Sequence, residues 1–193
     1  MDKSDFFKRS LTESSEVKLK ILDSCEGSTI EAIDLIVNMF KNGGKLLLCG
    51  NGGSAADCQH IATEFMIRLN HEINRPALPA IAITTDSSNL TAGGNDIGYE
   101  NIFARNVEGL GNKGDILLSI STSGNSKNVI KAIEKAKEKG MINIALLGGD
   151  GGKIKPMVDC AIIIPSENTQ RIQEGHITVE HIICELVELE LYK

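Results

Sequence analysis

The chain has 193 residues, enough for one domain with a well-covered core, and no change in composition along it suggests a second domain. Its formal net charge is −6 and no segment gathers Lys and Arg into a stripe, which argues against a general nucleic-acid surface. No run approaches the roughly 20 apolar residues that a membrane-spanning helix needs.

Two segments near the N-terminus, residues 6–24 and 30–40, carry apolar residues at helical spacing. Just before the second segment, Ser28 and Glu31 stand three positions apart, in the arrangement of a capping box. The sequence therefore predicts that the chain begins with two helices.

Short apolar runs bounded by glycine or proline follow, at residues 45–49, 80–84, 115–120, 143–147 and 160–164. Their continuous apolar character favours strands buried on both faces of a parallel sheet, and intervening segments such as residues 126–138 favour covering helices. A last amphipathic helix is predicted over residues 169–192, although Gly175 inside it costs about 1 kcal/mol in helix propensity without an evident reason. The pattern predicts a doubly wound α/β sandwich.

Ligands of an open parallel sheet bind beyond the carboxyl ends of its strands, and two turns there are unusual. Residues 49–54 hold three glycines, which let the backbone approach a ligand, and they lead into a helix whose first amides point at that ligand. Residues 121–126 place four hydroxyls around one glycine before another helix. Hydroxyls and helix-terminal amides can hold a phosphate without Lys or Arg, and the alternative is a solvated cap.

Two predicted helices also carry metal-ligand types. His60 and Glu64 are four residues apart and project from one face of the helix after the first turn, a spacing that many helices show without a metal. Far along the chain, Gln173 is followed by His176 and His181. The two segments together offer ligands for one divalent metal, and periodicity does not choose between the two later histidines.

The cysteines indicate the compartment. They are five in number, scattered and free of any Cys-x-x-Cys pair, and residues 1–5 lack the apolar core of a secretion signal. We therefore expect a reducing cytoplasm. Cys58 is two residues from His60 and faces away from it on a helix, which favours packing over metal binding.

Residues 51–54 (NGGS), 95–96 (ND), 121–126 (STSGNS) and 171–174 (RIQE), together with His181, resemble the phosphoheptose isomerase branch of the SIS domain family over nearly the whole chain. The resemblance implies a three-layer, flavodoxin-like sandwich with a five-stranded parallel sheet. It implies one SIS domain over residues 1–193, whose N-terminal helices, about residues 3–41, serve oligomerisation. It also implies an aldose–ketose isomerase that converts sedoheptulose 7-phosphate to D-glycero-D-manno-heptose 7-phosphate, as a cytoplasmic homotetramer with sites at subunit interfaces. The product would supply heptose to lipopolysaccharide core or capsule.

The same resemblance assigns roles to residues. It implies one zinc ion per subunit, held by His60, Glu64, Gln173 and His181, although glutamine is an uncommon zinc ligand and another divalent ion could serve. It implies Glu64 as the base and His181 as the opposite acid/base in an enediol mechanism. The implied substrate-binding residues are Asn51, Gly52, Gly53, Ser54, Glu64, Asn95, Asp96, Ser121, Thr122, Ser123, Ser126 and Gln173. Beside them, His176 is expected to be a satisfied polar residue, and Asp57 to orient the imidazole of His60.

Three other functions fit parts of the pattern. Residues 50–55 match the G-x-G-x-x-A form of a dinucleotide fingerprint, which would make the chain an oxidoreductase, but no acidic residue closes a strand about 20 residues on. A non-catalytic SIS module that associates with a bacterial replication initiator would not need the acid/base residues. An isomerase of another phosphosugar would share most of the same features.

Overall fold

A computed structural model describes residues 1–193 and contains one five-stranded parallel sheet in the order β2-β1-β3-β4-β5. The strands are β1 (Leu46–Gly50), β2 (Ala80–Ala82), β3 (Ile116–Ser121), β4 (Ile142–Gly148) and β5 (Cys160–Ile164). All five predicted strands are confirmed, with β2 shorter than its apolar run. Strands β1, β3 and β4 are buried almost throughout on both faces. Burial on both faces explains why their sequences are continuously apolar rather than alternating.

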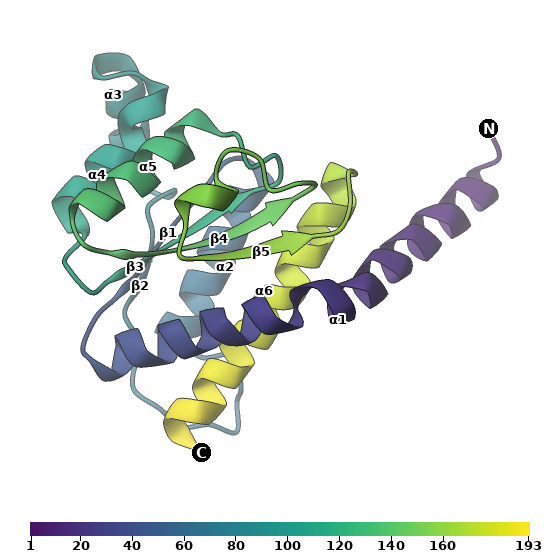
Figure 1. Ribbon diagram of the computed structural model, residues 1–193, viewed down its shortest axis with the longest axis horizontal. Helices are drawn as coiled ribbons and strands as arrows, with labels where there is room; N and C mark the ends of the chain where they lie inside the picture. Colours follow the sequence, from purple (N-terminus) through teal and green to yellow (C-terminus); the bar gives the residue numbers. More distant parts are fainter.

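Helices cover both faces of the sheet, so the predicted three-layer sandwich is confirmed (Figure 1). One face carries α1 (Lys3–Lys41), α2 (Gly53–Met66) and α6 (Thr169–Tyr192), and the other carries α4 (Ile102–Leu110) and α5 (Lys127–Glu138). Helix α3 (Ser87–Asp96) has no buried residue and projects from the body, and two short 3-10 turns complete the chain, η1 (Tyr99–Asn101) and η2 (Lys155–Met157). No helix combines the length and apolar character that a membrane crossing requires.

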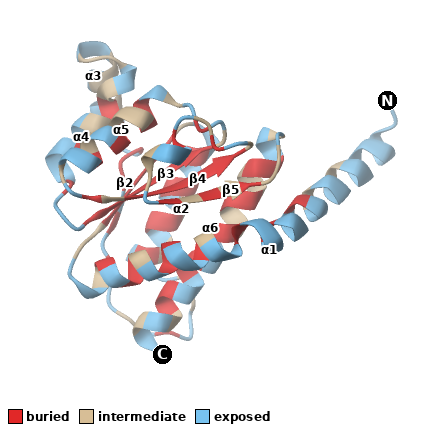
Figure 2. Cartoon of the chain, in the orientation of Figure 1, coloured by how far each residue is buried: buried red, intermediate tan, exposed pale blue.

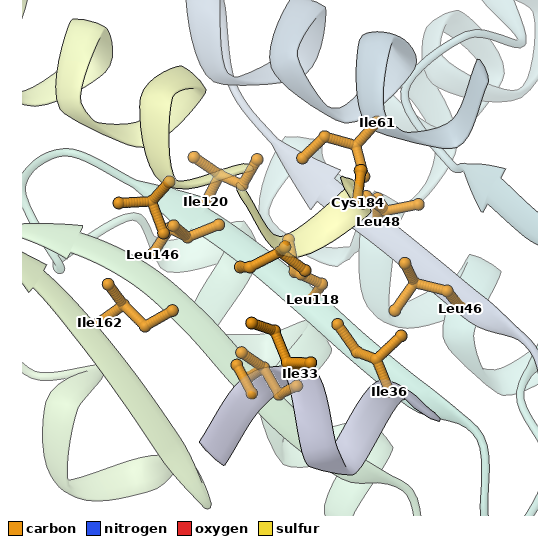
Figure 3. Close-up of a cluster of buried hydrophobic side chains, with 14 of the residues drawn as sticks. Ile33, Ile36, Leu46, Leu48, Ile61, Leu118, Ile120, Leu146, Ile162 and Cys184 are labelled. Carbon is orange, nitrogen blue, oxygen red and sulfur yellow. The ribbon is translucent and has the colours of Figure 1, made fainter. Parts of the chain in front are cut away.

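The larger core lies between the sheet and the layer formed by α1, α2 and α6. Figure 3 shows Leu118 and Ile120 of β3 among side chains from α1 and α2, including Ile33 and Ile61, and all of these are buried. Figure 2 shows the sheet as buried throughout its centre, whereas the N-terminal part of α1 extends into solvent. Burial of this apolar surface fixes the helices on the sheet and thereby fixes what they carry.

The N-terminal region differs from the prediction of two helices, because α1 is one helix of 39 residues. The hydroxyl of Ser28, expected to cap a second helix, instead donates to the carbonyl oxygen of Cys25 at 3.1 Å within α1. Cys25 is fully buried, and its thiol contacts the carbonyl oxygen of Ile163 in β5. Packing on β5 therefore keeps the segment helical through Gly27, and this tertiary contact outweighs the local serine and glycine signal.

The glycine inside the last helix also has a structural explanation. At Gly175 a Cβ atom would lie 2.7 Å from Cγ2 of Ile164 in β5. No side chain fits there, so glycine allows α6 to approach the edge of the sheet closely. The propensity that the helix loses is offset by this close packing of helix on strand.

The strand order determines where a ligand can bind. Strands β1 and β3 are neighbours with Gly50 opposite Ile120, and the chain leaves β1 toward β2 on one side while β3 leads to β4 on the other. This is the topological switch point of the sheet, and the crevice beyond it is where doubly wound folds bind ligands. Both turns singled out from the sequence follow these two strands.

Candidate active site

The first turn joins β1 to α2 and lies against α6. Gly52 has a φ of 58°, in the left-handed region that favours glycine. A side chain at Gly53 would collide with the amide of Gln173, so glycine here lets α6 reach the start of α2. Ser54 is buried within the first turn of α2. The turn thus brings backbone amides and the Gln173 side chain to the same place.

The second turn joins β3 to α5 and presents hydroxyls. Ser121 is buried and its Oγ lies 3.1 Å from Oγ of Ser126, whereas Thr122 is half-buried and Ser123 is exposed. Ser126 precedes α5 but its side chain caps no amide of that helix. The turn is held from behind by the loop after β4, since the backbone amide of Ile154 donates to the carbonyl oxygen of Gly124 at 3.0 Å. Hydroxyls and the N-terminus of α5 therefore face one space, as an anion site requires.

Asparagine side chains tie the two turns together. Asn51 and Asn128 exchange two side-chain hydrogen bonds of 2.9 and 2.8 Å, and the hydroxyl of Tyr99 donates to Oδ1 of Asn51 at 2.8 Å. Together with Ser126, Lys127 and Glu100, these three residues line an open cavity of about 480 Å³. The glycine-rich and serine-rich turns therefore share one ligand space.

Four of these cavity residues, Tyr99, Glu100, Lys127 and Asn128, were missed by the sequence reasoning. Lys127 stands first in the helix after the serine-rich turn, a position from which a cation next to an anion site could have been inferred. Asn128 and Tyr99 carry no sequence signal, because their pairing with Asn51 depends on the packing of α5 and η1 beside β1. The cavity is therefore lined by a cation, Lys127, in addition to the hydroxyl groups expected from the sequence.

Residues 121 positions apart meet where α2 contacts α6. Nε2 of His60 lies 2.8 Å from Nε2 of His181, and the two rings meet edge to face. Oε1 of Glu64 lies 3.6 Å from Nε2 of His60. Only 16% of the Glu64 side chain is exposed, whereas 40% of the His60 side chain is. Two imidazoles and a carboxylate thus converge at the surface of the two helices.

This convergence bears on metal binding. No group of three or more His, Cys, Asp or Glu side chains is arranged as a ready-made metal site. The nitrogen and oxygen atoms around His60 nevertheless have the donor chemistry that zinc takes, two imidazole nitrogens and a carboxylate oxygen. The chemistry of these three donors therefore fits a divalent metal, while the two imidazole nitrogens are at hydrogen-bond distance from each other and the fourth implied ligand, Gln173, bonds Asp57.

Gln173 and Asp57 lie together, toward the first turn. Nε2 of Gln173 donates to Oδ2 of Asp57 at 3.4 Å, and neither residue forms a hydrogen bond with the two histidines. The expectation that Asp57 orients the ring of His60 is thus replaced by a contact with Gln173. Burial raises the pKa of the Asp57 carboxyl, and the hydrogen bond from Gln173 and the nearby His60 act in the opposite direction.

Asn95 and Asp96 lie apart from the other expected substrate contacts. They end α3, are exposed, and bond to each other, with Nδ2 of Asn95 donating to Oδ1 of Asp96 at 2.7 Å. Within one chain, no hydrogen bond ties them to either turn, to His60 or to His181.

His176 and Cys58 are packed inside the protein. Cys58 is fully buried, and all five cysteines are free thiols. Nε2 of His176 lies 3.0 Å from the carbonyl oxygen of Leu147, so this nitrogen carries the hydrogen, and the buried Nδ1 has no partner. Burial lowers the pKa of His176 to about 4, against a smaller opposite effect of that hydrogen bond. His176 is thus a neutral core residue in this structure.

A doubly wound sheet of this order, with a glycine-rich and a hydroxyl-rich turn at its switch point, defines an SIS domain, and residues 11–148 match the SIS domain family. The phosphoheptose isomerase of Helicobacter pylori is 50% identical over 95% of this chain and 95% of its own length. That of Chlorobium phaeobacteroides is 51% identical over 93% of this chain and 80% of its own length. The structure of the phosphoheptose isomerase from Neisseria gonorrhoeae superposes with a TM-score of 0.92 at 41% identity, over 97% of this chain and all (100%) of that one.

The chain therefore belongs to the phosphoheptose isomerase family of SIS domain proteins, and it is an enzyme. The family expected from the sequence motifs is confirmed. The alternatives of a dinucleotide-binding oxidoreductase and of a non-catalytic SIS module do not apply.

We expect the pH dependence of stability to carry the signature of the buried His176. Between about pH 4 and pH 6.5 the unfolded chain binds a proton at this residue that the folded protein does not. The contribution of His176 to the free energy of unfolding is therefore intact above about pH 6.5. It is lost as the pH falls, by roughly 2 kcal/mol at about pH 5. Urea unfolding of the wild type and of His176→Gln, at one protein concentration and several pH values, measures this.

Other titrating groups are shared by both proteins, so the difference between the two free energies of unfolding isolates His176. That difference should shift in favour of His176→Gln as the solution becomes more acidic. If it stays constant from about pH 7.5 to about pH 5, His176 is not held neutral by burial.

Proposed function

We propose that this enzyme interconverts sedoheptulose 7-phosphate and D-glycero-D-manno-heptose 7-phosphate. The observation that carries the proposal is the meeting of His60, Glu64 and His181 where α6 contacts α2, the helix that begins at the glycine-rich turn. The names of the Helicobacter and Chlorobium relatives, at about half identity over nearly the whole chain, support the choice of substrate.

The reaction moves a proton between adjacent carbons of the open-chain sugar through an enediol, while a second proton moves between oxygens. Glu64 acts as the base that removes the carbon-bound proton, and its mostly buried carboxylate is shielded from water. His181 acts as the opposite acid/base, because an imidazole can both give and accept a proton near neutral pH. Its Nε2 is already engaged with His60, so the donor and acceptor roles of the pair are coupled.

The residues that would hold a divalent metal, zinc by resemblance, are His60, Glu64, Gln173 and His181. When bound, such an ion polarises the carbonyl and hydroxyl oxygens of the substrate and stabilises negative charge on the enediol. His60 lies between Glu64 and His181, so it positions both reacting groups. The side-chain amide of Gln173 packs against Gly53 and donates a hydrogen bond to Asp57. These contacts place the amide at the glycine-rich turn, where it can bind substrate hydroxyls.

The phosphate is held at the second turn. Ser121, Thr122, Ser123 and Ser126 supply hydroxyls, and the N-terminus of α5 supplies amides and a favourable dipole. Lys127, which lines the same cavity, adds the one cation that the sequence reasoning did not require. The turn over Asn51, Gly52, Gly53 and Ser54 faces the rest of the sugar.

The active protein is a homotetramer in which α1 is the main oligomerisation element. An apolar groove of about 440 Å³ runs between α1 and α6, lined by residues that include Ile30 and Leu186, which are 50% and 37% exposed. Such a contiguous apolar surface is typical of a contact with another chain. Asn95 and Asp96, which no hydrogen bond ties to the histidine pair of their own chain, would bind substrate at a site shared between subunits.

The product supplies heptose for lipopolysaccharide core or capsule. The enzyme works in the cytoplasm, where its five free cysteines stay reduced. All five thiols are buried, and burial raises the pKa of Cys49 and Cys160 to about 12, so they are unreactive in this setting.

Substitution of the two proton-transfer residues tests the proposed reaction. We expect Glu64→Gln and His181→Ala each to lower kcat for sedoheptulose 7-phosphate by at least about a hundredfold, because each variant removes a group that exchanges a proton. Turnover is followed by conversion of the ketose to the aldose, and circular dichroism establishes that the variants are folded. Glu134→Gln, on an exposed position of α5, serves as the control and should keep wild-type rates. Wild-type turnover in both test variants would rule out this assignment.

The phosphate cradle is tested separately through KM. We expect Ser123→Ala to raise KM by about tenfold with little change in kcat, because the hydroxyl binds the unreacting end of the substrate equally in the ground and transition states. Steady-state kinetics measure both constants, and Ser15→Ala on the exposed part of α1 is the matched control. A fall in kcat at unchanged KM would place Ser123 at the reacting carbons instead.

The apolar groove predicts the assembly state. We expect the wild type to elute with the mass of about four chains, and a double Ile30→Glu/Leu186→Glu variant to dissociate into smaller species, because charge in a buried apolar contact is strongly unfavourable. Light scattering coupled to size-exclusion chromatography measures the mass. Leu110→Glu places the same charge on a similarly exposed leucine of α4 and should not alter it. If the double variant keeps the wild-type mass, the groove is not the interface.

A further inference from the structure

A buried ion pair joins the loop after α2 to the last helix. Nη2 of Arg75 lies 2.6 Å from Oε1 of Glu188, and Nε of Arg75 donates to the same oxygen at 2.7 Å. Both side chains are entirely shielded from solvent. In the sequence, each residue looks like an ordinary surface charge, and nothing in the reaction described above uses either of them.

The guanidinium of Arg75 also holds the end of α2. Its Nη2 donates to the carbonyl oxygen of Glu64 at 2.7 Å, and its Nη1 donates to the carbonyl oxygen of Phe65 at 2.7 Å. The last carbonyls of a helix have no partner within the helix and carry partial negative charge, so a cation there is favourable. One of these two carbonyl groups belongs to Glu64, the proposed base.

Glu188 completes the connection from the side of α6. Its two carboxylate oxygens accept from the backbone amides of Leu69 and Asn70, at 3.1 and 3.0 Å, in the loop that leaves α2. Glu188 is seven residues after His181, so the two project from nearly the same side of α6, about two turns apart. The ion pair therefore links the helix that carries Glu64 to the helix that carries His181.

An apolar pair would cover these two helices equally well. Removing two charges from water carries a large desolvation penalty, and apolar replacements of buried ion pairs are often no less stable. The ion pair adds a fixed relative orientation of the two helices. A planar guanidinium that bonds a carboxylate and two carbonyl oxygens at once permits one placement of α2 on α6.

We propose that Arg75 and Glu188 are positioning residues that fix α2 on α6 so that His60 and Glu64 face His181. This inference deepens the proposed isomerase function and rests on its assignment of Glu64 and His181. A displacement of about 1 Å at reacting groups can lower a rate by about a hundredfold, so the registration of two helices matters to the chemistry.

Three variants separate positioning from stability. Arg75→Lys keeps the charge but loses the planar fork, and Glu188→Gln keeps the shape but loses the charge. Each of these single variants leaves a buried group without its full partner, which can unfold the chain, so Arg75→Met/Glu188→Met removes both charges together. Lys45→Met is the control, since it breaks an ion pair between the residues that precede β1 and β3, and the carboxylate of Asp115 bonds residues 45 and 112 rather than α2 or α6.

The first readout is the imidazole pair itself in metal-free protein. The chain has four histidines, so long-range proton–nitrogen spectra of the rings are simple to assign. We expect the ring nitrogen signals of His60 and His181 to shift in Arg75→Lys and in the double variant, while those of His176, bonded to Leu147, stay in place as an internal reference. Lys45→Met should leave all of them unchanged.

The second readout is the rate well below the unfolding temperature of each variant. We expect kcat to fall about 10- to 100-fold in Arg75→Lys and in the double variant, with KM changed less than about twofold, as for residues that orient catalytic groups. Lys45→Met should keep wild-type kcat even where its unfolding temperature drops. If Arg75→Lys and the double variant lose stability but keep wild-type ring signals and kcat, Arg75 and Glu188 are structural only and the inference is overturned.

The two proposals fail in different ways. If the wild type does not isomerise sedoheptulose 7-phosphate, the proposed function is wrong, and the ring signals alone decide whether the ion pair positions the helices. If the wild type is active and the ring signals of the variants do not move, the function stands and the positioning role falls.

Discussion

The close approach of α2 to α6 over one face of the sheet is the constraint on which the site depends. His60 and His181 are 121 positions apart and meet only because both helices are packed on the same buried strands. Glycine lets α6 approach α2 at Gly53, where a side chain would collide with Gln173, and lets α6 approach β5 at Gly175, where a side chain would collide with Ile164. The geometry of the proposed catalytic residues is thus set by backbone packing first, and polar contacts such as the Arg75–Glu188 pair refine it.

The acidic character of the chain shapes the chemistry near this contact. Glu180, next to His181, is buried with no hydrogen-bond partner for either oxygen. Burial raises the pKa of its carboxyl well above the usual range, and the nearby charge of Asp57 adds to the effect. A raised pKa favours the neutral form of Glu180, which lowers the negative charge near a site that has to accept a phosphorylated substrate. Local neutrality, helix amides and Lys127 together reconcile anion binding with a net charge of −6.

The parts of the fold that the sequence predicts are those governed by local patterns. Continuous apolar runs identify the strands, and glycine or serine clusters identify the turns, because each follows from nearest-neighbour chemistry. The N-terminal region shows the limit, since the capping signal at Ser28 is overridden by packing of Cys25 on β5. Likewise, no local pattern distinguishes Arg75 and Glu188 from surface charges, and none pairs Tyr99 with Asn51, because both contacts exist only after distant elements have docked. The four-residue spacing of His60 and Glu64 identifies them as candidate ligands, whereas only the family resemblance selects His181 over His176.

The helix that carries His181 also lines the apolar groove, through Ile182 and Leu186 on its exposed side. In the proposed tetramer, a neighbouring chain that covers this groove would therefore press on the helix that holds half of the histidine pair. Asn95 and Asp96 are exposed at the end of α3, a helix that projects from the body of the subunit, which makes them available to a neighbour (Figure 1). Assembly and the proposed catalysis are then coupled through α6, because the surface that joins subunits and the proposed acid/base His181 belong to the same helix.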